Sequence, residues 1–273
     1  MNMMQISSDN ETSSAQKQFI RHHKCHHHFV TGMRFLVLFC FLSVWEISAK
    51  FGIIDTFFFS CPSMVLSYFV KMIKDGSFFS NTGITLLETL FSFVLVTAFS
   101  LITAILLWYS KTLSEILEPY LVILNSLPKS ALAPLFIVWL GTGTDTIIVA
   151  GISVALFGSI INLYTGFKHV DEEKLKLIYT LGGKRRHILR YILLPGSRPV
   201  ILSGMKVNIG LCLVGVVIGE FLAARQGLGY LIIYGSQVFK LDWVLMSILI
   251  LCLIAMGLYK VVELAEKWYC QRP

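Results

Sequence analysis

The sequence is poor in charged residues. Only 14% of its 273 residues are Asp, Glu, Lys or Arg, whereas 55% are hydrophobic and the mean hydropathy is +0.72. A soluble domain carries about 25% charged residues and could not bury this much apolar surface. The composition therefore predicts an integral membrane protein. The formal net charge of +7 does not indicate nucleic-acid binding, because in a membrane protein Lys and Arg mark the loops of one side.

Sequence motifs of catalysis are also missing. There is no G-x-x-x-x-G-K-[ST] loop to cradle phosphates, and Gly183-Lys184 lacks both the upstream glycine and the following hydroxyl residue. The sequence contains no H-E-x-x-H, C-x-x-C or G-x-S-x-G. Its six Cys lie mostly inside apolar runs, without paired spacing. We therefore predict no catalytic residue, no metal site and no cofactor, and a chain that is not itself an enzyme.

Residues 1–32 are polar and end in the run RHHKCHHHF, which holds five of the seven His. Imidazoles in such a run could bind a transition metal weakly. The simpler interpretation is a solvated, disordered tail, since no carboxylate lies near enough in sequence to complete a site. We predict a disordered cytoplasmic tail, followed by one transmembrane domain over residues 33–273.

Apolar runs predict about six transmembrane helices, because a helix needs about 20 residues to cross a bilayer. The runs cover residues 33–49, 86–109, 120–140, 146–164, 200–222 and 243–259. The mixed segment 51–85 is expected to be a loop with a short interfacial helix over residues 64–73. Residues 110–119 are expected to be a short polar connection.

Two prolines interrupt the third run, Pro128 and Pro134. Proline removes a backbone hydrogen bond and kinks a helix. Such a break inside a membrane is tolerated only where protein or a water-filled path satisfies the backbone. Either this run is a bent helix that lines a pathway, which makes both prolines pathway candidates, or the span simply begins after Pro128.

The segment over residues 167–199, between the fourth and fifth spans, is too charged to enter lipid. It has eight Lys or Arg against three Asp or Glu, and its apolar residues recur at helical spacing. Gly182-Gly183 predicts a helix stop, and Pro195 is expected to end the second helix. Six spans place both termini and this segment on one side, and the Lys/Arg excess predicts that this side is the cytoplasm.

Ionisable residues within the spans are few: Glu46, Glu88, Lys206 and Glu220. All four lie toward the ends of spans, so no central proton relay is evident. Lys206 is expected to extend its ammonium to the membrane surface. The chain therefore has the elements of a pathway but no evident source of energy of its own.

Several motifs together resemble a known family. Gly182, nine further residues and Ile192-x-Leu194-Pro195 match the G-x9-I-x-L-P core of the "EAA" loop, and Thr180-Leu181 precede it. This loop is typical of the inner-membrane permease subunits of binding-protein-dependent ATP-binding-cassette importers. Further segments match in order, namely Trp45-Glu46, Cys61-Pro62-Ser63, residues 127–143, Glu220-Phe221-Leu222 and residues 227–232. Over residues 35–265 the chain is similar to the nitrate, sulfonate, taurine and bicarbonate group, which includes relatives that carry thiamine precursors.

The resemblance implies an all-α permease subunit in a bacterial inner membrane. It would form a homodimer, bind an ATPase subunit through residues 167–199 and receive a small polar or anionic solute from an extracytoplasmic solute-binding protein. Transport would follow alternating access. The implied ATPase-coupling residues are Lys176, Leu177, Ile178, Thr180, Leu181, Gly182, Gly183, Ile192, Leu194 and Pro195. Candidates for an outer gate are Glu220, Gly227 and Gly229, although residues 227–230 could equally be a simple re-entry turn.

The sequence departs from the family at the triplet that names the loop. Lys176-Leu177-Ile178 stands where an acidic residue and two alanines are expected, although Glu172 and Glu173 lie one turn earlier. Either the loop prefers a particular ATPase or it is degenerate, and the intact glycine and proline frame favours a particular ATPase. A stand-alone secondary transporter or channel is the alternative function. The missing charge relay and the lack of evident inverted repeats argue against it.

Overall fold

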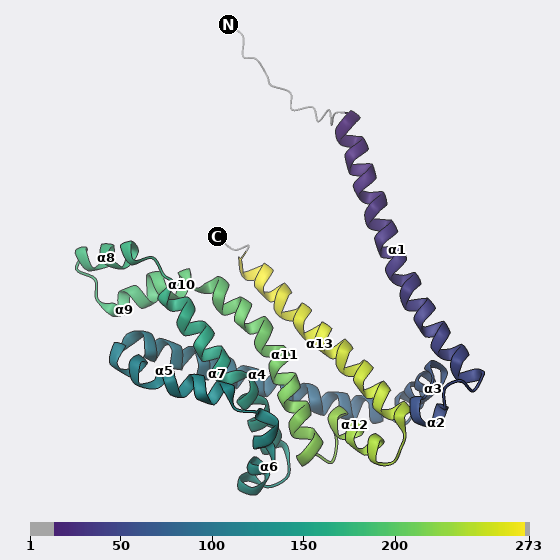
Figure 1. Cartoon of the computed structure of the whole chain (residues 1–273). Helices are drawn as coiled ribbons and strands as arrows, with labels where there is room; N and C mark the ends of the chain where they lie inside the picture. Colours follow the sequence, from purple (N-terminus) through teal and green to yellow (C-terminus); the bar gives the residue numbers. More distant parts are fainter. Residues whose placement is uncertain (1–13, 271–273) are drawn as a thin grey trace. The chain divides into compact units, whose positions relative to one another are not determined.

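The computed structural model describes residues 14–270, which form helices joined by short connections (Figure 1). The chain divides into two compact units, residues 1–63 and 64–273. The elements are α1 (Ser14–Lys50), α2 (Thr56–Phe59), α3 (Pro62–Lys74), α4 (Ser77–Tyr109), α5 (Lys111–Ser126), α6 (Lys129–Leu140), α7 (Thr144–Lys168), α8 (Glu172–Thr180), α9 (Arg185–Ile188), the π-helix η1 (Leu189–Leu193), α10 (Leu194–Gly196), α11 (Arg198–Ala223), α12 (Leu228–Gln237) and α13 (Leu241–Cys270). The predicted all-α fold is confirmed.

The first unit is dominated by α1, which begins well before the first apolar run. Residues 14–32, which we expected to be disordered, are helical. Residues 14–31 contain neither Pro nor Gly, and extending an existing helix costs far less free energy than nucleating one. Within this unit Glu46 accepts a hydrogen bond from the amide of Ser63 at 3.1 Å and pairs with Lys50 at 3.4 Å.

Five of the described helices are long and apolar enough to cross a membrane. They are α4, α7, α11, the Gly32–Lys50 part of α1 and the Leu241–Trp268 part of α13. The pair α5 and α6 also qualifies, with a bend of 96° between its halves. The pair is either one broken span or a loop that returns to the side from which it came.

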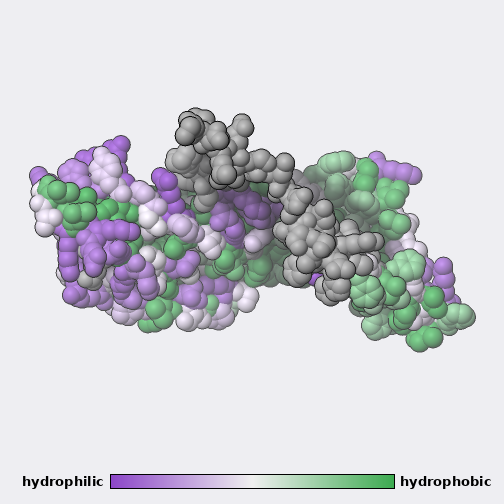
Figure 2. Space-filling model, turned by 90° about the horizontal axis from the view of Figure 1, so that it is seen from above, coloured by the Kyte–Doolittle hydropathy of each residue, from purple (hydrophilic) through white to green (hydrophobic). Residues whose placement is uncertain are grey.

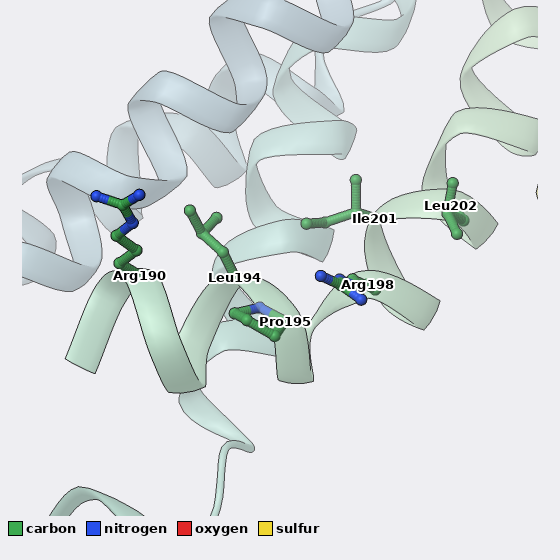
Figure 3. A pocket seen from close by; sticks show the side chains of 6 residues that line it. All are labelled: Arg190, Leu194, Pro195, Arg198, Ile201 and Leu202. Atoms are coloured by element: carbon green, nitrogen blue, oxygen red, sulfur yellow. The ribbon is translucent and has the colours of Figure 1, made fainter. Parts of the chain in front are cut away.

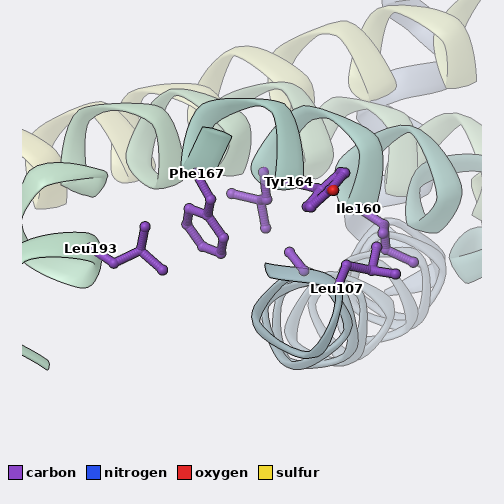
Figure 4. Close-up of a cluster of buried hydrophobic side chains, with 7 residues drawn as sticks. Leu107, Ile160, Tyr164, Phe167 and Leu193 are labelled. Atoms are coloured by element: carbon purple, nitrogen blue, oxygen red, sulfur yellow. The ribbon is translucent and has the colours of Figure 1, made fainter. Parts of the chain in front are cut away.

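The packing of α4 and α7 decides between these two arrangements. Leu107, near the end of α4, and Phe167, near the end of α7, belong to the same buried apolar cluster (Figure 4). Toward the other ends, Ser92 of α4 donates a hydrogen bond to the carbonyl of Ile148 in α7 at 3.4 Å. The two helices therefore run parallel, so α5 and α6 must carry the chain back across the membrane. The pair is one broken span, which completes the six predicted spans.

The break lies at Leu127 and Pro128, both of which have extended backbones. Proline disfavours the helical conformation of the residue before it, which explains why α5 ends at Ser126. The ammonium of Lys129 donates a hydrogen bond to the carbonyl of Leu124, which the break has left without a helical partner. The span therefore does not begin after Pro128, because α5 is helical on the other side. Residues 110–119, expected to be a polar connection, belong mostly to α5.

The second unit is held together by the close approach of α7 to α4 and α11. A Cβ built on Gly215 of α11 would lie 2.8 Å from the Cα of Gly151 in α7, and one on Gly219 would lie 2.9 Å from the Cα of Ile147. Gly151 is also close to α4, since a Cβ on it would lie 2.7 Å from the hydroxyl of Ser92. Small residues at such positions let helix backbones touch, which is a common means of packing in membranes.

Lys206, which we expect to extend its ammonium to the membrane surface, has a partner within the protein. Its ammonium forms an ion pair with the carboxylate of Glu266 in α13, and both side chains are about four-fifths buried (20% and 22% exposed). The pair links α11 to α13, and the sequence alone did not reveal it.

Candidate functional sites in the hairpin and the carboxyl cluster

We call residues 167–199 the hairpin. Its first helix, α8, begins at Asp171, whose carboxylate accepts a hydrogen bond from the amide of Glu173 at 2.9 Å. Such N-caps are favoured because they satisfy an otherwise free amide of the first turn. The predicted helix, glycine turn and second helix are all present.

Gly182 and Gly183 close α8 with a Schellman motif. The amide of Gly183 donates to the carbonyl of Ile178 at 2.8 Å, and the amide of Gly182 donates to that of Tyr179 at 3.0 Å. Gly182 has φ +77°, a conformation that costs an L-residue about 1 kcal/mol or more. The turn therefore requires glycine at position 182, as the sequence predicted.

The second half of the hairpin differs from the expectation that Pro195 ends it. A π-helical turn, η1, precedes Pro195, and α10 continues to Gly196. Proline has no amide and clashes with the carbonyl four residues earlier. A wider π-turn accommodates this clash without ending the helix. The chain therefore passes into α11 with a turn only at Ser197.

The root of the hairpin, by which we mean Arg185 and Leu193, is anchored to the neighbouring helices α4 and α7. Leu193 is fully buried in the cluster that also holds Phe167 and Leu107 (Figure 4). Arg185 donates a hydrogen bond to the backbone carbonyl of Tyr109, and its guanidinium carbon lies 5.7 Å from the centre of the Tyr109 ring. The root is therefore in contact with both α4 and α7.

The predicted coupling residues fall into two groups. The first group is exposed and forms the tip of the hairpin, on α8 and the glycine turn that follows it. Its members are Lys176, Leu177, Thr180, Leu181 and Gly182. The others are half-buried, and they are Ile178, Gly183, Ile192, Leu194 and Pro195. The tip also exposes the aromatic ring of Tyr179. In the space-filling view, hydrophilic residues gather at the hairpin end of the second unit, with hydrophobic residues among them (Figure 2).

The tip is unusually apolar for a charged hairpin. Leu177 is 58% exposed and Leu181 75% exposed. A contiguous apolar surface on a soluble segment is typical of a protein-binding site. The tip therefore has the character of a docking surface.

A second site lies around Glu220, which is fully buried near the end of α11. Its carboxylate accepts hydrogen bonds from the hydroxyl of Thr85 at 2.6 Å and from the amide of Gly229. Thr85 in turn accepts a bond from the amide of Leu228 at 2.9 Å. We call Asn81, Thr85, Glu88 and Glu220 the carboxyl cluster.

The cluster fastens the turn before α12 to α4. The amide of Gly227 donates to the side chain of Asn81 at 2.8 Å, so three successive amides, those of residues 227–229, are satisfied by buried side chains. These amides form the positive end of α12, which favours a negative group beside them. The cluster therefore acts as a side-chain cap for this helix.

Both glycines of the turn fit against the Glu220 carboxylate. A Cβ on Gly227, whose φ is +114°, would lie 2.5 Å from one carboxylate oxygen, and one on Gly229 would lie 2.7 Å from the other. The sequence-predicted gate residues Glu220, Gly227 and Gly229 are therefore in mutual contact. Pro128 and Pro134 lie elsewhere, on the broken span.

Glu88 was not among the site residues predicted from the sequence, although it belongs to the carboxyl cluster. Its carboxyl group lies beside that of Glu220 and is only 4% exposed, and its Oε2 has no hydrogen-bond partner in the part of the chain that the structure describes. It lines a cavity of about 480 Å³ beside Thr144 and Arg225. A signal was present in the sequence, since the buried polar residues of α4 recur at helical spacing: Asn81, Thr85, Glu88, Thr89 and Ser92.

Among the described residues, no group of three His, Cys, Asp or Glu could hold a metal ion. The side chains of the His run over residues 22–28 lie outside the description.

Six spans, an anchored hairpin with an exposed apolar tip and a buried carboxyl cluster at the other end of α11 are the features of a polytopic membrane protein. The comparisons with known proteins agree. Residues 96–272, more than half of the chain, match the family described as "Binding-protein-dependent transport system inner membrane component". The chain belongs to this family of ATP-binding-cassette permeases. It is therefore a multi-pass inner-membrane component of an importer and is not itself catalytic, and the family implies ATPase and solute-binding partners.

Individual relatives cover most of the chain. A probable ABC transporter permease of Haemophilus influenzae is 30% identical over 82% of this chain and 91% of its own length. A putative aliphatic sulfonates permease, SsuC of Bacillus subtilis, is 26% identical over 83% and 82%. A formylaminopyrimidine permease, ThiX of Halalkalibacterium halodurans, is 26% identical over 68% and 74%. A chain of the inward-facing MetNI methionine transporter has the same fold, with a TM-score of 0.60 at 16% identity over 68% of this chain and 93% of that chain.

Proposed function

We propose that the chain forms the translocation pathway of an importer for a small polar or anionic solute, of the sulfonate or thiamine-precursor type. It acts as a homodimer whose two hairpins each bind one ATPase subunit. The observation that carries this proposal is the exposed apolar tip of the hairpin, Leu177, Tyr179 and Leu181, on a root packed against α4 and α7. Two relatives named for sulfonates and for formylaminopyrimidine support the solute class.

Transport proceeds by alternating access. Closure of the ATPases on ATP moves the hairpins, and the rigid root passes this displacement to the spans. At the other end, the carboxyl cluster holds α12 against α4 and serves as part of the outer gate. The broken span, with Pro128 and Pro134, lines the pathway.

Reconstitution tests the function directly. The permease, its ATPase and its binding protein in proteoliposomes should accumulate labelled taurine or formylaminopyrimidine only when ATP is supplied to the ATPase side. The permease alone should neither bind nor hydrolyse ATP, since it lacks a phosphate-cradling loop. Uptake that is independent of ATP would point to the stand-alone transporter instead.

The proposed orientation places the hairpin and both termini in the cytoplasm and residues 141–145 outside. The Lys and Arg of the hairpin motivate this orientation. Single cysteines at Arg186 and at Thr142, introduced into a chain without its own cysteines, should react differently with an impermeant maleimide applied to intact cells. We expect labelling at position 142 alone. Labelling of position 186 from outside would contradict the proposed coupling to an ATPase.

A further inference from the structure

Glu88 lines a cavity of about 480 Å³, which we call the Glu88 cavity. Three segments that are distant in sequence surround it: α4, the turn that leads into α7, and the residues around the end of α11. Its polar side chains come from all three segments, and they are Glu88, Thr142, Thr144, Arg225 and Gln226. The cavity thus combines an acidic group, a basic group and hydroxyl groups.

The Glu88 cavity lies at the end of α11 that is away from the hairpin. At the other end, where the hairpin joins α11, a smaller cavity of about 340 Å³ lies beside Arg190, Pro195 and Arg198 (Figure 3). The 26 residues of α11 separate the two cavities by roughly 40 Å. A substitution in the Glu88 cavity therefore leaves the hairpin unaltered.

The charged groups of this cavity differ from Glu220 in their hydrogen bonding. The carboxylate of Glu220 is held by Thr85 and by the amide of Gly229, whereas Oε2 of Glu88 has no hydrogen-bond partner among the described residues. Arg225 is exposed and forms no ion pair with any residue that the structure describes. A buried carboxyl oxygen without a partner costs free energy, which a ligand that donates a hydrogen bond to Glu88 would recover.

We propose that the Glu88 cavity binds a small zwitterion, with the amino group of the ligand at Glu88 and its acidic group at Arg225. An ammonium suits this place because Glu88 and Glu220 are neighbouring carboxyl groups, and a nearby cation relieves the repulsion between two carboxylates. A guanidinium donates paired hydrogen bonds to the oxygens of an acidic group. Arg225 repels a metal cation and Glu88 repels a simple anion, so the cavity favours a ligand that carries both charges.

The position of the cavity suits the first step of import. The inference rests on the proposed function, in which this end of α11 faces the solute-binding protein, and it narrows the solute to an amino acid or an aminosulfonate. A zwitterion released at this end would meet Glu88 and Arg225 before it enters the pathway. The permease itself would then take part in selecting the solute.

Three compounds with the same two-carbon chain separate the contributions of the two charges. Taurine carries an amino group and a sulfonate, isethionate has a hydroxyl in place of the amino group, and ethanolamine has a hydroxyl in place of the sulfonate. Equilibrium binding of each compound is measured with the full-length permease in lipid nanodiscs. We expect taurine to bind about tenfold more tightly than either of the other two, because each of those lacks one charge-assisted interaction.

Isosteric variants then assign each charge to its residue. Glu88→Gln should weaken the binding of taurine about tenfold and leave that of isethionate unchanged, whereas Arg225→Gln should weaken the binding of both sulfonates and leave that of ethanolamine unchanged. The matched controls are Asp145→Asn and Lys71→Gln, which remove the same charges from exposed side chains outside the cavity. Both controls should bind all three compounds like the parent protein.

Several results would overturn the inference. They are the absence of saturable taurine binding, an equal loss for all three compounds in the Glu88→Gln variant, and an equal loss in the controls. If Glu88→Gln weakens only the attachment of the solute-binding protein, the cavity belongs to that partner instead. ATP-driven uptake without ligand binding in the Glu88 cavity would refute this inference alone. Taurine binding by a permease that supports no ATP-driven uptake would refute the proposed function alone.

Discussion

Replacing Leu177 by aspartate is expected to abolish both co-purification of the ATPase and ATP-dependent uptake. The side chain is 58% exposed at the hairpin tip, so the folded permease tolerates a carboxylate there at little cost. Burying that carboxylate, unpaired, in an apolar groove of the partner would cost several kcal/mol. The measurement is pull-down of the ATPase from membranes with matched permease levels.

Lys174→Gln is the matched control for Leu177→Asp. It changes the charge of α8 by the same amount and in the same direction, and its ion pair with Asp171 is long, at 4.0 Å, and exposed. Such a pair contributes little free energy, so ATPase binding should persist. If the Leu177→Asp variant retains full ATPase association, the tip is not the docking surface and the hairpin is only a connection.

Replacing Gly227 by valine is expected to disable transport, although Gly227 lies at the other end of α11 from the hairpin. Its φ of +114° is unfavourable for any residue with a Cβ, and that atom would lie 2.5 Å from the Glu220 carboxylate. Backbone strain and overpacking together should cost roughly 3 kcal/mol. The carboxyl cluster would release the start of α12, so uptake and the Tm should fall while ATPase co-purification is retained, because the hairpin is unaltered.

Gly210→Val separates this local effect from the general cost of replacing a glycine by valine. A Cβ on Gly210 meets no atom within 4 Å, so the variant should transport and melt like the parent protein. Unchanged uptake and Tm in the Gly227→Val variant would mean that the turn before α12 is a simple re-entry turn without a gating role.

The sequence was informative wherever a feature depends on neighbouring residues. Apolar runs located the spans, and Gly182-Gly183 located a turn whose hydrogen bonds reach back only to Tyr179 and Ile178. The resemblance to the permease family also selected Glu220, Gly227 and Gly229, which the structure brings together.

Features that depend on distant partners could not be predicted in the same way. The second span was expected from residue 86, yet α4 begins at Ser77. Residues such as Asn81 and Thr85 are typical of loops, and only their bonds to residues 143 to 146 positions away explain their burial. The partner of Lys206 could not be predicted for the same reason, since Glu266 lies in α13.

The glycine contacts between α4, α7 and α11 also limit how the protein can move. At Gly151, Gly215 and Gly219 the helix backbones touch their neighbours. If one helix slid along another, larger residues would move into these positions and collide with the neighbouring helix. We therefore expect these three helices to tilt together. The 96° corner at Leu127 and Pro128 is also held against α7, since a Cβ on Gly158 would lie 3.2 Å from the side-chain oxygen of Asn125 and the ammonium of Lys129 lies 5.2 Å from the centre of the Phe157 ring.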